Sequence, residues 1–179
     1  MLLMEPTVPD QPYNVLFLCT GNSARSILGE ALMNKMGGDR FRAYSAGSQP
    51  KGDVHPMSLE VLDSFGYPTE GLHSKNWSEF TKPGAPEFDF IFTVCDNAAG
   101  ESCPVWPGKP LTAHWGVEDP AAVEGDGQRQ AFVDALSYLK RRIELFLMLP
   151  LKSIDDMSVR SKLAAIGREE GATAKAREA

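Results

Sequence analysis

The sequence predicts an α/β fold in three layers, with a short central parallel sheet of about four strands flanked by helices. Two observations lead to this prediction. Short apolar runs alternate along the chain with stretches in which apolar side chains recur at helical spacing. The length of 179 residues also fits one domain, because single domains are typically roughly 100–200 residues long.

The first predicted strand is the apolar run at residues 13–18, which is typical of a strand buried on both faces of a sheet. A glycine-containing loop follows, and after it comes a helix whose apolar positions recur at helical spacing. These positions are Ile27, Leu28, Ala31, Leu32 and Met36. Gly37 and Gly38 can end that helix, and residues 41–44 predict a second strand.

The second half of the predicted sheet comes from residues 88–94 and 111–114. A helix that begins at Pro56 and ends before Gly66 precedes these strands, and a long amphipathic helix over residues 128–148 follows them. Strands that alternate with helices predict a parallel sheet, here in a flavodoxin-like order. Ligands of such sheets bind at the carboxyl ends of the strands, so the functional site is expected there.

We predict three parts along the chain. Residues 1–12 form a flexible amino-terminal segment, residues 13–150 form the domain, and residues 151–179 form a carboxyl-terminal segment. In the last part, residues 153–166 predict one more helix. The tail from Gly167 is charged and rich in alanine, which predicts a mobile end of the chain.

The charge of the chain argues against two classes of function. The formal net charge is -6, whereas nucleic-acid and anionic-membrane binding both need a basic face. The basic run Lys140-Arg141-Arg142 is interpreted as a solvated helix face. The amino terminus lacks the pattern of a signal peptide, and the longest apolar run, residues 145–151, is too short to cross a bilayer. A cytoplasmic protein is therefore expected, without nucleic-acid or membrane partners.

Counting alone leaves the use of the three cysteines open; they are Cys19, Cys95 and Cys103. Three are too few for a disulfide framework, and a structural zinc ion normally needs four ligands. Cys19 and Cys95 both fall at the carboxyl ends of predicted strands, where a functional site is expected. The alternative is that all three are half-buried cysteines that act as small hydrophobic side chains.

The strongest local signal is the stretch from Cys19 to Ser26, which reads Cys-Thr-Gly-Asn-Ser-Ala-Arg-Ser. It lies between a predicted strand and a predicted helix, so successive backbone N–H groups are expected to point into one concavity and bind a tetrahedral oxyanion. The expected oxyanion-binding residues are Thr20, Gly21, Asn22, Ser23, Ala24 and Arg25. A cysteine and an arginine at this spacing also occur by chance, but the strand before them and the helix after them make the pattern specific.

The side chains of this loop suit a nucleophilic cysteine. Arg25 supplies planar, bidentate donors for two oxygens of the anion, and Ser26 can donate a hydrogen bond to the Cys19 sulfur. The backbone dipoles and the guanidinium are expected to lower the pKa of Cys19 below its ordinary value, which favours the reactive thiolate.

With its preceding strand, the loop resembles that of the low-molecular-weight tyrosine phosphatase superfamily, and specifically the thioredoxin-coupled arsenate reductases of that fold. The similarity covers roughly residues 13–148. It continues in Tyr44-Ser45-Ala46-Gly47, His55-Pro56, His73-Ser74, Cys95-Asp96, Cys103-Pro104 and residues 114–120. Phosphatases of the fold usually have proline where this chain has Ile27 and tyrosine where it has Ala121, which favours the reductase branch.

The resemblance implies a reaction that three thiols carry in turn. Cys19 attacks arsenate, and Asp119 acts as the general acid for the leaving oxygen. Cys95 then attacks the Cys19 sulfur, which releases arsenite and leaves a Cys19–Cys95 disulfide. Cys103 attacks Cys95 next, and thioredoxin reduces the resulting Cys95–Cys103 disulfide; glutathione with glutaredoxin, or mycothiol, are the alternative reductants. The small, polar residues 96–102 are expected to form the mobile loop that this exchange needs.

Two other functions stay open at this stage. The same loop with Asp119 fits a low-molecular-weight protein tyrosine phosphatase, an activity that a reductase can also retain in residual form. The third function is a non-catalytic module that binds oxyanions or senses redox state. Arsenate reduction by a cytoplasmic enzyme of arsenic detoxification is the leading hypothesis, because Cys95 and Cys103 accompany the loop.

No tightly bound cofactor is expected, although some relatives hold a potassium ion beside the loop. The resemblance places its ligands at Asn22, Glu30, Ser45 and Asn76. Asn76 stands where an aspartate is expected. His114 and Trp115 are interpreted as packing and loop support, and Trp77 and Phe80 as anchors of a short helix on the sheet.

Overall fold

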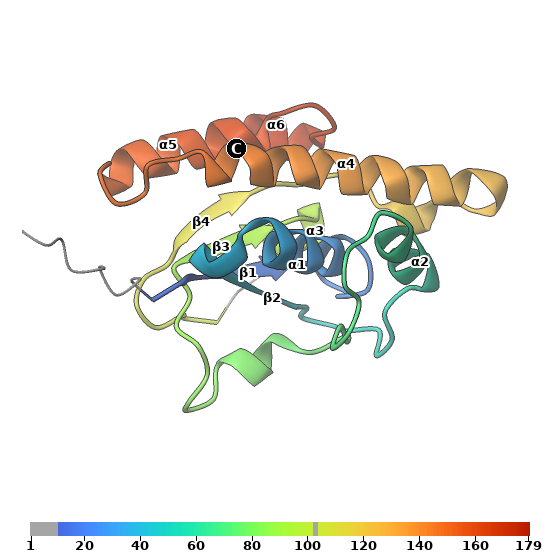
Figure 1. Ribbon diagram of the computed structural model, residues 1–179, viewed down its shortest axis with the longest axis horizontal. Helices are drawn as coiled ribbons and strands as arrows, with labels where there is room; N and C mark the ends of the chain where they lie inside the picture. Colours follow the sequence, from blue (N-terminus) through green and yellow to red (C-terminus); the bar gives the residue numbers. More distant parts are fainter. Residues whose placement is uncertain (1–10, 102–103) are drawn as a thin grey trace, which may run out of the picture.

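Four parallel strands form one sheet in the order β2-β1-β3-β4 (Figure 1). The computed structural model describes residues 11–101 and 104–179. The strands are β1 (Tyr13–Leu18), β2 (Phe41–Ala46), β3 (Phe90–Thr93) and β4 (Leu111–His114). The predicted α/β fold with a four-stranded parallel sheet flanked by helices is confirmed.

Helices occupy both sides of this sheet, and most of them lie on one side. The α-helices of the described residues are α1 (Arg25–Met36), α2 (Pro56–Ser64), α3 (Asp96–Gly100), α4 (Gln128–Leu147), α5 (Asp156–Gly167) and α6 (Ala174–Glu178). Short 3-10 turns are η1 (Gly38–Arg40), η2 (Trp77–Phe80), η3 (Pro120–Ala122) and η4 (Gly125–Gly127). Figure 1 shows α4, α5 and α6 above the sheet and the green turn η2 below it. No helix of the described residues is long and apolar enough to cross a membrane.

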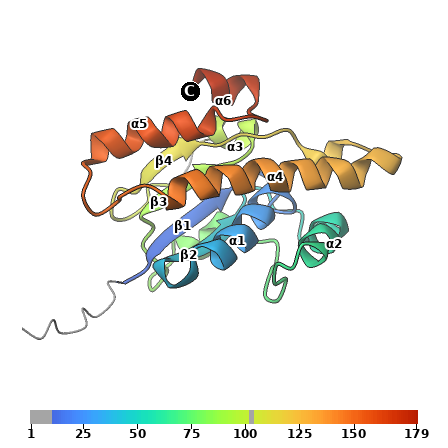
Figure 2. The ribbon, with the colours of Figure 1, turned by 45° about the horizontal axis from the view of Figure 1, so that its top comes forward.

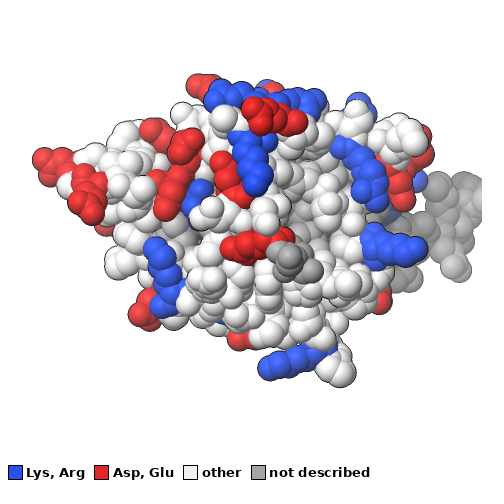
Figure 3. Space-filling model, turned by 180° about the vertical axis from the view of Figure 1, so that it is seen from behind, with Lys and Arg blue, Asp and Glu red and all other residues white. Residues whose placement is uncertain are grey.

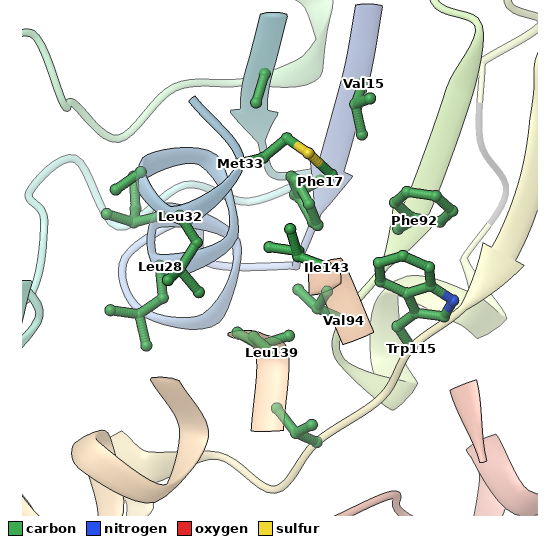
Figure 4. Packing of buried hydrophobic residues seen from close by; sticks show 14 of the residues in the cluster. Val15, Phe17, Leu28, Leu32, Met33, Phe92, Val94, Trp115, Leu139 and Ile143 are labelled. Atoms are coloured by element: carbon green, nitrogen blue, oxygen red, sulfur yellow. The ribbon is translucent and has the colours of Figure 1, made fainter. Parts of the chain in front are cut away.

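Alternation along the strands divides the apolar side chains between two clusters. Val15 and Phe17 of β1 belong to the larger cluster, which joins the sheet to α1, α4 and α5 (Figure 4). Within it, Trp115 stacks on Phe92 with ring centroids 3.7 Å apart and planes at 9°. Burial of each such large apolar side chain contributes about 1.5–3 kcal/mol to folding.

The smaller cluster lies on the opposite face of the sheet, where Leu16 and Leu18 of β1 pack with Ile91 of β3. Trp77 and Phe80 of η2 pack against this cluster and cover it. The predicted role of these two aromatic residues as anchors of a short helix is confirmed.

The carboxyl-terminal segment contains the predicted helix, α5, and packs on the rest of the domain. Figure 2 shows α5 running along the sheet beside β4, with α6 next to α3. Thr173 N donates to Gly116 O at 3.1 Å, and Ala172 forms a bridge with Val117. Hydrogen bonds and the fully buried Ala176 thus attach these residues to the rest of the domain, and the predicted mobility of the tail from Gly167 stays a prediction.

Arg142 differs from its prediction, because it is fully buried rather than solvated. Its guanidinium donates to Tyr138 O at 2.9 Å, Glu170 O at 3.1 Å and Glu169 O at 3.0 Å. The bonds to Glu169 and Glu170 satisfy carbonyl groups that follow α5, so Arg142 fixes the chain after α5 to α4. Lys140 and Arg141 are exposed, as the sequence predicts.

Candidate active site

The loop that begins at Cys19 lies at the carboxyl end of β1 and leads directly into α1. Cys19 N donates to Ala46 O at 3.2 Å, so the loop starts as an extension of the β1–β2 ladder. Gly47 then touches the loop so closely that an added Cβ would lie 2.6 Å from Cys19 O and closer still to Thr20 O. Only glycine permits this approach, which holds the loop against the sheet.

The carbonyl groups of the loop point outward, toward neighbouring segments. The backbone bonds are Gln49 N to Thr20 O, Lys51 N to Gly21 O and His55 N to Ser23 O, each at 3.0 Å. Ser58 Oγ and Ser74 Oγ donate to two of the same carbonyl groups. Because these peptide units turn their oxygens away from the loop centre, their N–H groups are free to face a ligand inside it.

The inner side of the loop opens into a cavity of about 290 Å³. All six predicted oxyanion-binding residues line it, together with Gln49, Lys51, Cys95, Asn97 and Asp119. On the face shown in Figure 3, basic and acidic side chains are intermingled rather than gathered into one basic field. The cavity itself carries the guanidinium of Arg25 and the ammonium of Lys51 among its lining side chains.

Arg25 has one donor that no described residue satisfies. Its Nη1 donates to Val117 O at 2.8 Å, and its Nη2 lies 3.8 Å from Asp119 Oδ2. Its Nε is buried and has no hydrogen-bond partner among the described residues. An unpaired buried donor costs about 1–3 kcal/mol. An anion in the cavity that Arg25 lines would supply the missing acceptor.

Asp119 lies at the mouth of the same cavity. Its Oδ1 accepts from Ala121 N at 3.0 Å and so caps η3, which fixes the direction of the carboxyl group. The side chain is 42% exposed, so it can exchange protons with solvent. The structure thus brings Asp119 to the loop, where its predicted role as the general acid stays a prediction.

Cys95 lies beside Cys19, because β1 and β3 are neighbours in the sheet and both cysteines follow their carboxyl ends. The Cys95 sulfur accepts from Thr20 N at 3.3 Å and Ala98 N at 3.4 Å, and the thiol of Cys19 is hydrogen-bonded to it. Both cysteines are buried, with exposed fractions of 7% for Cys19 and 3% for Cys95.

The hydrogen bond between the two sulfurs sets their pKa values in opposite directions. It is the largest influence on Cys19 and raises the pKa of that thiol well above its ordinary value, with burial adding to the rise and Arg25 opposing it. The same bond lowers the pKa of Cys95 to about 5, against the effect of burial and with support from the two N–H groups. The pKa of Cys19 is thus raised, against the expected lowering, and the pair favours the negative charge on Cys95.

The first part of the segment after Cys95, Asp96–Gly100, forms the helix α3. The predicted mobility of residues 96–102 stays a prediction. Asp96 holds α3 in place: Asp96 Oδ1 accepts from Thr173 Oγ1 at 2.7 Å and lies 2.8 Å from His114 Nε2, and Asp96 O accepts from Lys175 Nζ at 3.3 Å. The predicted supporting role of His114 is confirmed. Thr173 and Lys175 were not expected here, since nothing in their local sequence distinguishes them.

Ser26 and Cys103 complete the predicted catalytic set. Ser26 is fully buried at the start of α1, and its Oγ accepts from Asn22 Nδ2 at 2.8 Å. This leaves the hydroxyl proton of Ser26 available to a further acceptor. Cys103 lies outside the described residues, so the Cys95–Cys103 disulfide stays a prediction. Cys19 and Cys95 are free cysteines here, and their redox disulfide stays a prediction as well.

A buried polar cluster lies beneath the loop, and it contains three of the residues expected to bind potassium. Asn22 has a φ of 43°, a left-handed conformation that asparagine tolerates better than most residues. Its Nδ2 donates to Ser45 Oγ at 3.0 Å, and its Oδ1 accepts from Lys75 N at 2.8 Å. Ser45 Oγ in turn donates to Glu30 Oε1 at 2.8 Å.

The fourth expected ligand, Asn76, points elsewhere. Its Oδ1 accepts from Ser78 N at 2.8 Å, and its Nδ2 donates to Ser48 O at 3.2 Å. In its place, Lys75 Nζ enters the cluster, 3.6 Å from Glu30 Oε1 and 3.4 Å from Ser45 Oγ. A potassium ion bound to these oxygens would lie against an ammonium group, so the residues present do not fit the expected ion.

A family model and a similar protein of known sequence point to the same family for this chain. The chain matches the family described as low molecular weight phosphotyrosine protein phosphatase over residues 14–160. The arsenate reductase of Halalkalibacterium halodurans is 32% identical over 134 residues, which cover 74% of this chain and 93% of that protein.

Solved structures show the same fold. The arsenate reductase from Archaeoglobus fulgidus is similar with a TM-score of 0.55 and 28% identity, over 73% of this chain and 98% of that one. The thioredoxin-dependent arsenate reductase of Corynebacterium glutamicum is similar with a TM-score of 0.54 and 24% identity, over 78% of this chain and 65% of that one.

Proposed function

The chain belongs to the low molecular weight phosphotyrosine protein phosphatase family, and within it we propose that this protein is an arsenate reductase. The observation that carries the proposal is the second buried cysteine beside the first. Cys95 is hydrogen-bonded to Cys19 and has a pKa of about 5, so a thiolate stands ready next to the nucleophile. Hydrolysis of a phosphate ester has no use for that thiolate, whereas reduction of arsenate requires it.

The first step is attack of the Cys19 sulfur on arsenic. Cys19 carries the proton of the pair, and monoprotonated arsenate carries one hydroxyl group. The sulfur–arsenic bond forms, one arsenic–oxygen bond breaks, and the thiol proton joins the departing hydroxyl to give water. We propose that Asp119, whose carboxylate lies 3.8 Å from the Arg25 guanidinium, passes this proton. The loop N–H groups and Arg25 Nε hold the three remaining oxygens.

The second step uses the thiolate of Cys95. It attacks the Cys19 sulfur, the sulfur–arsenic bond breaks with both electrons left on arsenic, and arsenite departs after taking up protons. A Cys19–Cys95 disulfide remains, so two electrons have passed from the two sulfurs to arsenic. Cys95 enters the reaction with the negative charge of the pair. Once Cys19 has given up its proton, the N–H groups of Thr20 and Ala98 still donate to the Cys95 sulfur and stabilise its thiolate.

Regeneration of the enzyme completes the proposal. The thiolate of Cys103 attacks Cys95, which frees Cys19 and forms a Cys95–Cys103 disulfide that an external dithiol reduces. We propose a thioredoxin as that dithiol, because an intramolecular pair of this kind suits dithiol exchange and the similar Corynebacterium protein is thioredoxin-dependent. Three thiols that must stay reduced between turnovers also suit a cytoplasmic location.

Arsenite production in the presence of thioredoxin, thioredoxin reductase and NADPH tests this function. Arsenate-dependent oxidation of NADPH is expected from the wild-type protein, and its absence with every thiol reductant tried would contradict the proposal. Cys95→Ser is expected to lower arsenate turnover by at least about 10³-fold. Mass mapping after one turnover, without added reductant, is expected to find the Cys95–Cys103 linkage.

A tyrosine phosphatase is the second candidate, because the oxyanion loop and Asp119 serve that reaction equally well. Cys95→Ser separates the two functions. It leaves the loop intact, so hydrolysis of an aryl phosphate is expected to survive where arsenate reduction is lost. Cys19→Ser is the matched control and is expected to abolish both activities.

A further inference from the structure

The buried cluster beneath the loop holds a cation that belongs to the chain itself. Lys75 lies between α2 and η2, and its side chain is only 6% exposed; that of Glu30, on α1, is 12% exposed. A buried ammonium and a buried carboxylate are retained together because either one alone is strongly destabilising. We propose that Lys75 is a positioning residue of the oxyanion loop, and that its ammonium takes the place of a potassium ion.

A chain of contacts in the cluster connects the Lys75 ammonium to the oxyanion loop. Lys75 Nζ donates to His73 O at 2.8 Å and to Ser45 Oγ at 3.4 Å, and it faces Glu30 Oε1 at 3.6 Å. The contacts with His73 and Ser45 are hydrogen bonds, whereas the contact with Glu30 is an ion pair. Two hydrogen bonds and one ion pair therefore hold the Lys75 ammonium inside the protein.

Ser45 transmits this arrangement to Asn22. A hydroxyl has one proton and two acceptor sites. Ser45 gives its proton to Glu30 and accepts from Asn22 Nδ2 and from Lys75 Nζ, so all of its capacity is used. The orientation of Asn22 is thereby fixed, with its amide as donor toward the serine.

Asn22 then fixes the loop and the start of α1. Its second amide proton goes to Ser26 Oγ at 2.8 Å, and its Oδ1 accepts from the backbone of Lys75 at 2.8 Å. A left-handed residue such as Asn22 keeps its conformation only where its surroundings determine it. Lys75 thus acts on the oxyanion site through both its ammonium and its backbone, without touching a ligand.

Potassium binding is disfavoured by the same contacts. An ion at the oxygens of Glu30 and Ser45 would displace Lys75 Nζ or lie against it, and one carboxylate would then face two buried cations. We therefore expect anion binding by this protein to be independent of potassium. This inference concerns the oxyanion loop of the proposed reductase, but it holds for any oxyanion that the loop binds.

Inorganic phosphate is the probe, because its binding to the loop does not depend on turnover. The dissociation constant is measured calorimetrically for the wild-type protein in potassium, sodium and tetramethylammonium chloride at equal ionic strength, with the melting temperature alongside. Equal values in all three salts are expected. Tighter phosphate binding specifically in potassium would overturn the proposal.

Two variants test the positioning role. Lys75→Met is expected to raise the phosphate dissociation constant about 10-fold or more in every salt, and to raise KM for arsenate in parallel. Lys75→Asp places a second carboxylate in the cluster and is expected to bind phosphate weakly in sodium but to recover in potassium. An unchanged dissociation constant for Lys75→Met, or a Lys75→Asp variant without potassium-specific recovery, would contradict the inference.

Matched variants separate this role from general stability. The double variant Glu30→Gln/Lys75→Met removes both charges and is expected to fold, with phosphate binding that does not depend on potassium. It remains informative even where Lys75→Met alone unfolds. Phosphate binding by the double variant that depends on potassium would count against the inference. Lys82→Met, at an exposed lysine nearby, is expected to leave phosphate binding unchanged. Phosphate binding that follows these expectations while arsenate is not reduced would refute the proposed function and leave the role of Lys75 intact.

Discussion

Thr173 connects the carboxyl-terminal segment to the cysteine helix, and Thr173→Val tests that connection. Its Oγ1 donates to Asp96 Oδ1 at 2.7 Å and accepts from Ala176 N at 3.1 Å, as the cap of α6. Loss of a threonine cap costs about 1 kcal/mol. Loss of a bond to a carboxylate that is 40% exposed adds about 1 kcal/mol. The total of about 2 kcal/mol lowers the melting temperature by about 4–8 °C.

The effect of Thr173→Val is expected to depend on pH. Burial raises the pKa of Asp96, but the hydrogen bonds from Thr173 and His114 hold it below its ordinary value. A carboxyl group of this kind stabilises the fold above its unfolded pKa of roughly 3.9 and loses that contribution as the pH falls through the folded value. The difference in melting temperature between variant and wild type therefore has its largest value at neutral pH and becomes smaller below about pH 4.

Thermal unfolding followed by circular dichroism measures this difference, and amide hydrogen exchange locates it. Exchange at Ala98 and Ala99 in α3 is expected to quicken in Thr173→Val, because Asp96 loses one of its anchors. Thr112→Val, at an exposed position of β4, is the matched control and is expected to change neither quantity. A melting temperature and an α3 exchange rate equal to those of the wild type would refute the reasoning.

Three further predictions concern the cysteine pair, Gly47 and the buried Arg142. Thiolate absorbance of the protein is expected to titrate with an apparent pKa of about 5. Cys19→Ala removes the bond to Cys95 and is expected to move this titration to higher pH. A wild-type titration confined to alkaline pH would contradict the assignment of the low pKa to Cys95. Gly47→Ala is expected to cost about 1–3 kcal/mol and to abolish phosphate binding, whereas Gly127→Ala, whose added Cβ meets only a side-chain methyl group at 3.4 Å, is expected to bind normally. Arg142→Met is expected to lower the free energy of unfolding by about 3 kcal/mol, because carbonyl groups after α5 lose their buried donor; an unchanged urea midpoint would disprove this role.

The sequence predicted the meeting of Cys19 and Cys95 for a physical reason. Parallel strands bring their carboxyl ends to one edge of the sheet, and β1 and β3 are adjacent there, with Leu18 paired to Thr93. A residue just after each strand must therefore lie near the other. The loop from Cys19 to Arg25 could be predicted as well, because its strand, turn and helix are contiguous in the chain.

The sequence could not predict features that depend on distant partners. Thr173 and Asp96 are separated by 77 residues, and Arg142 finds its acceptors beyond the end of α5. The direction in which the pKa of Cys19 is shifted could not be predicted for the same reason. The loop residues lower that pKa, but the hydrogen bond to the distant Cys95 raises it by more. A charged residue in an ordinary helix or loop pattern is expected to be exposed, and only the packed fold shows otherwise.

The position expected for the fourth potassium ligand shows that a shift of one residue along the chain decides which side chain enters the site. The chain at residues 75–77 runs alongside Gly47: Gly47 N donates to Lys75 O and Trp77 N donates to Gly47 O, each at 3.0 Å. Neighbouring side chains of an extended segment point to opposite sides. Lys75 therefore faces Ser45 and Glu30, while Asn76 turns outward to Ser48. An aspartate directed inward would add a second carboxylate and require an external cation, whereas the inward lysine supplies the charge itself.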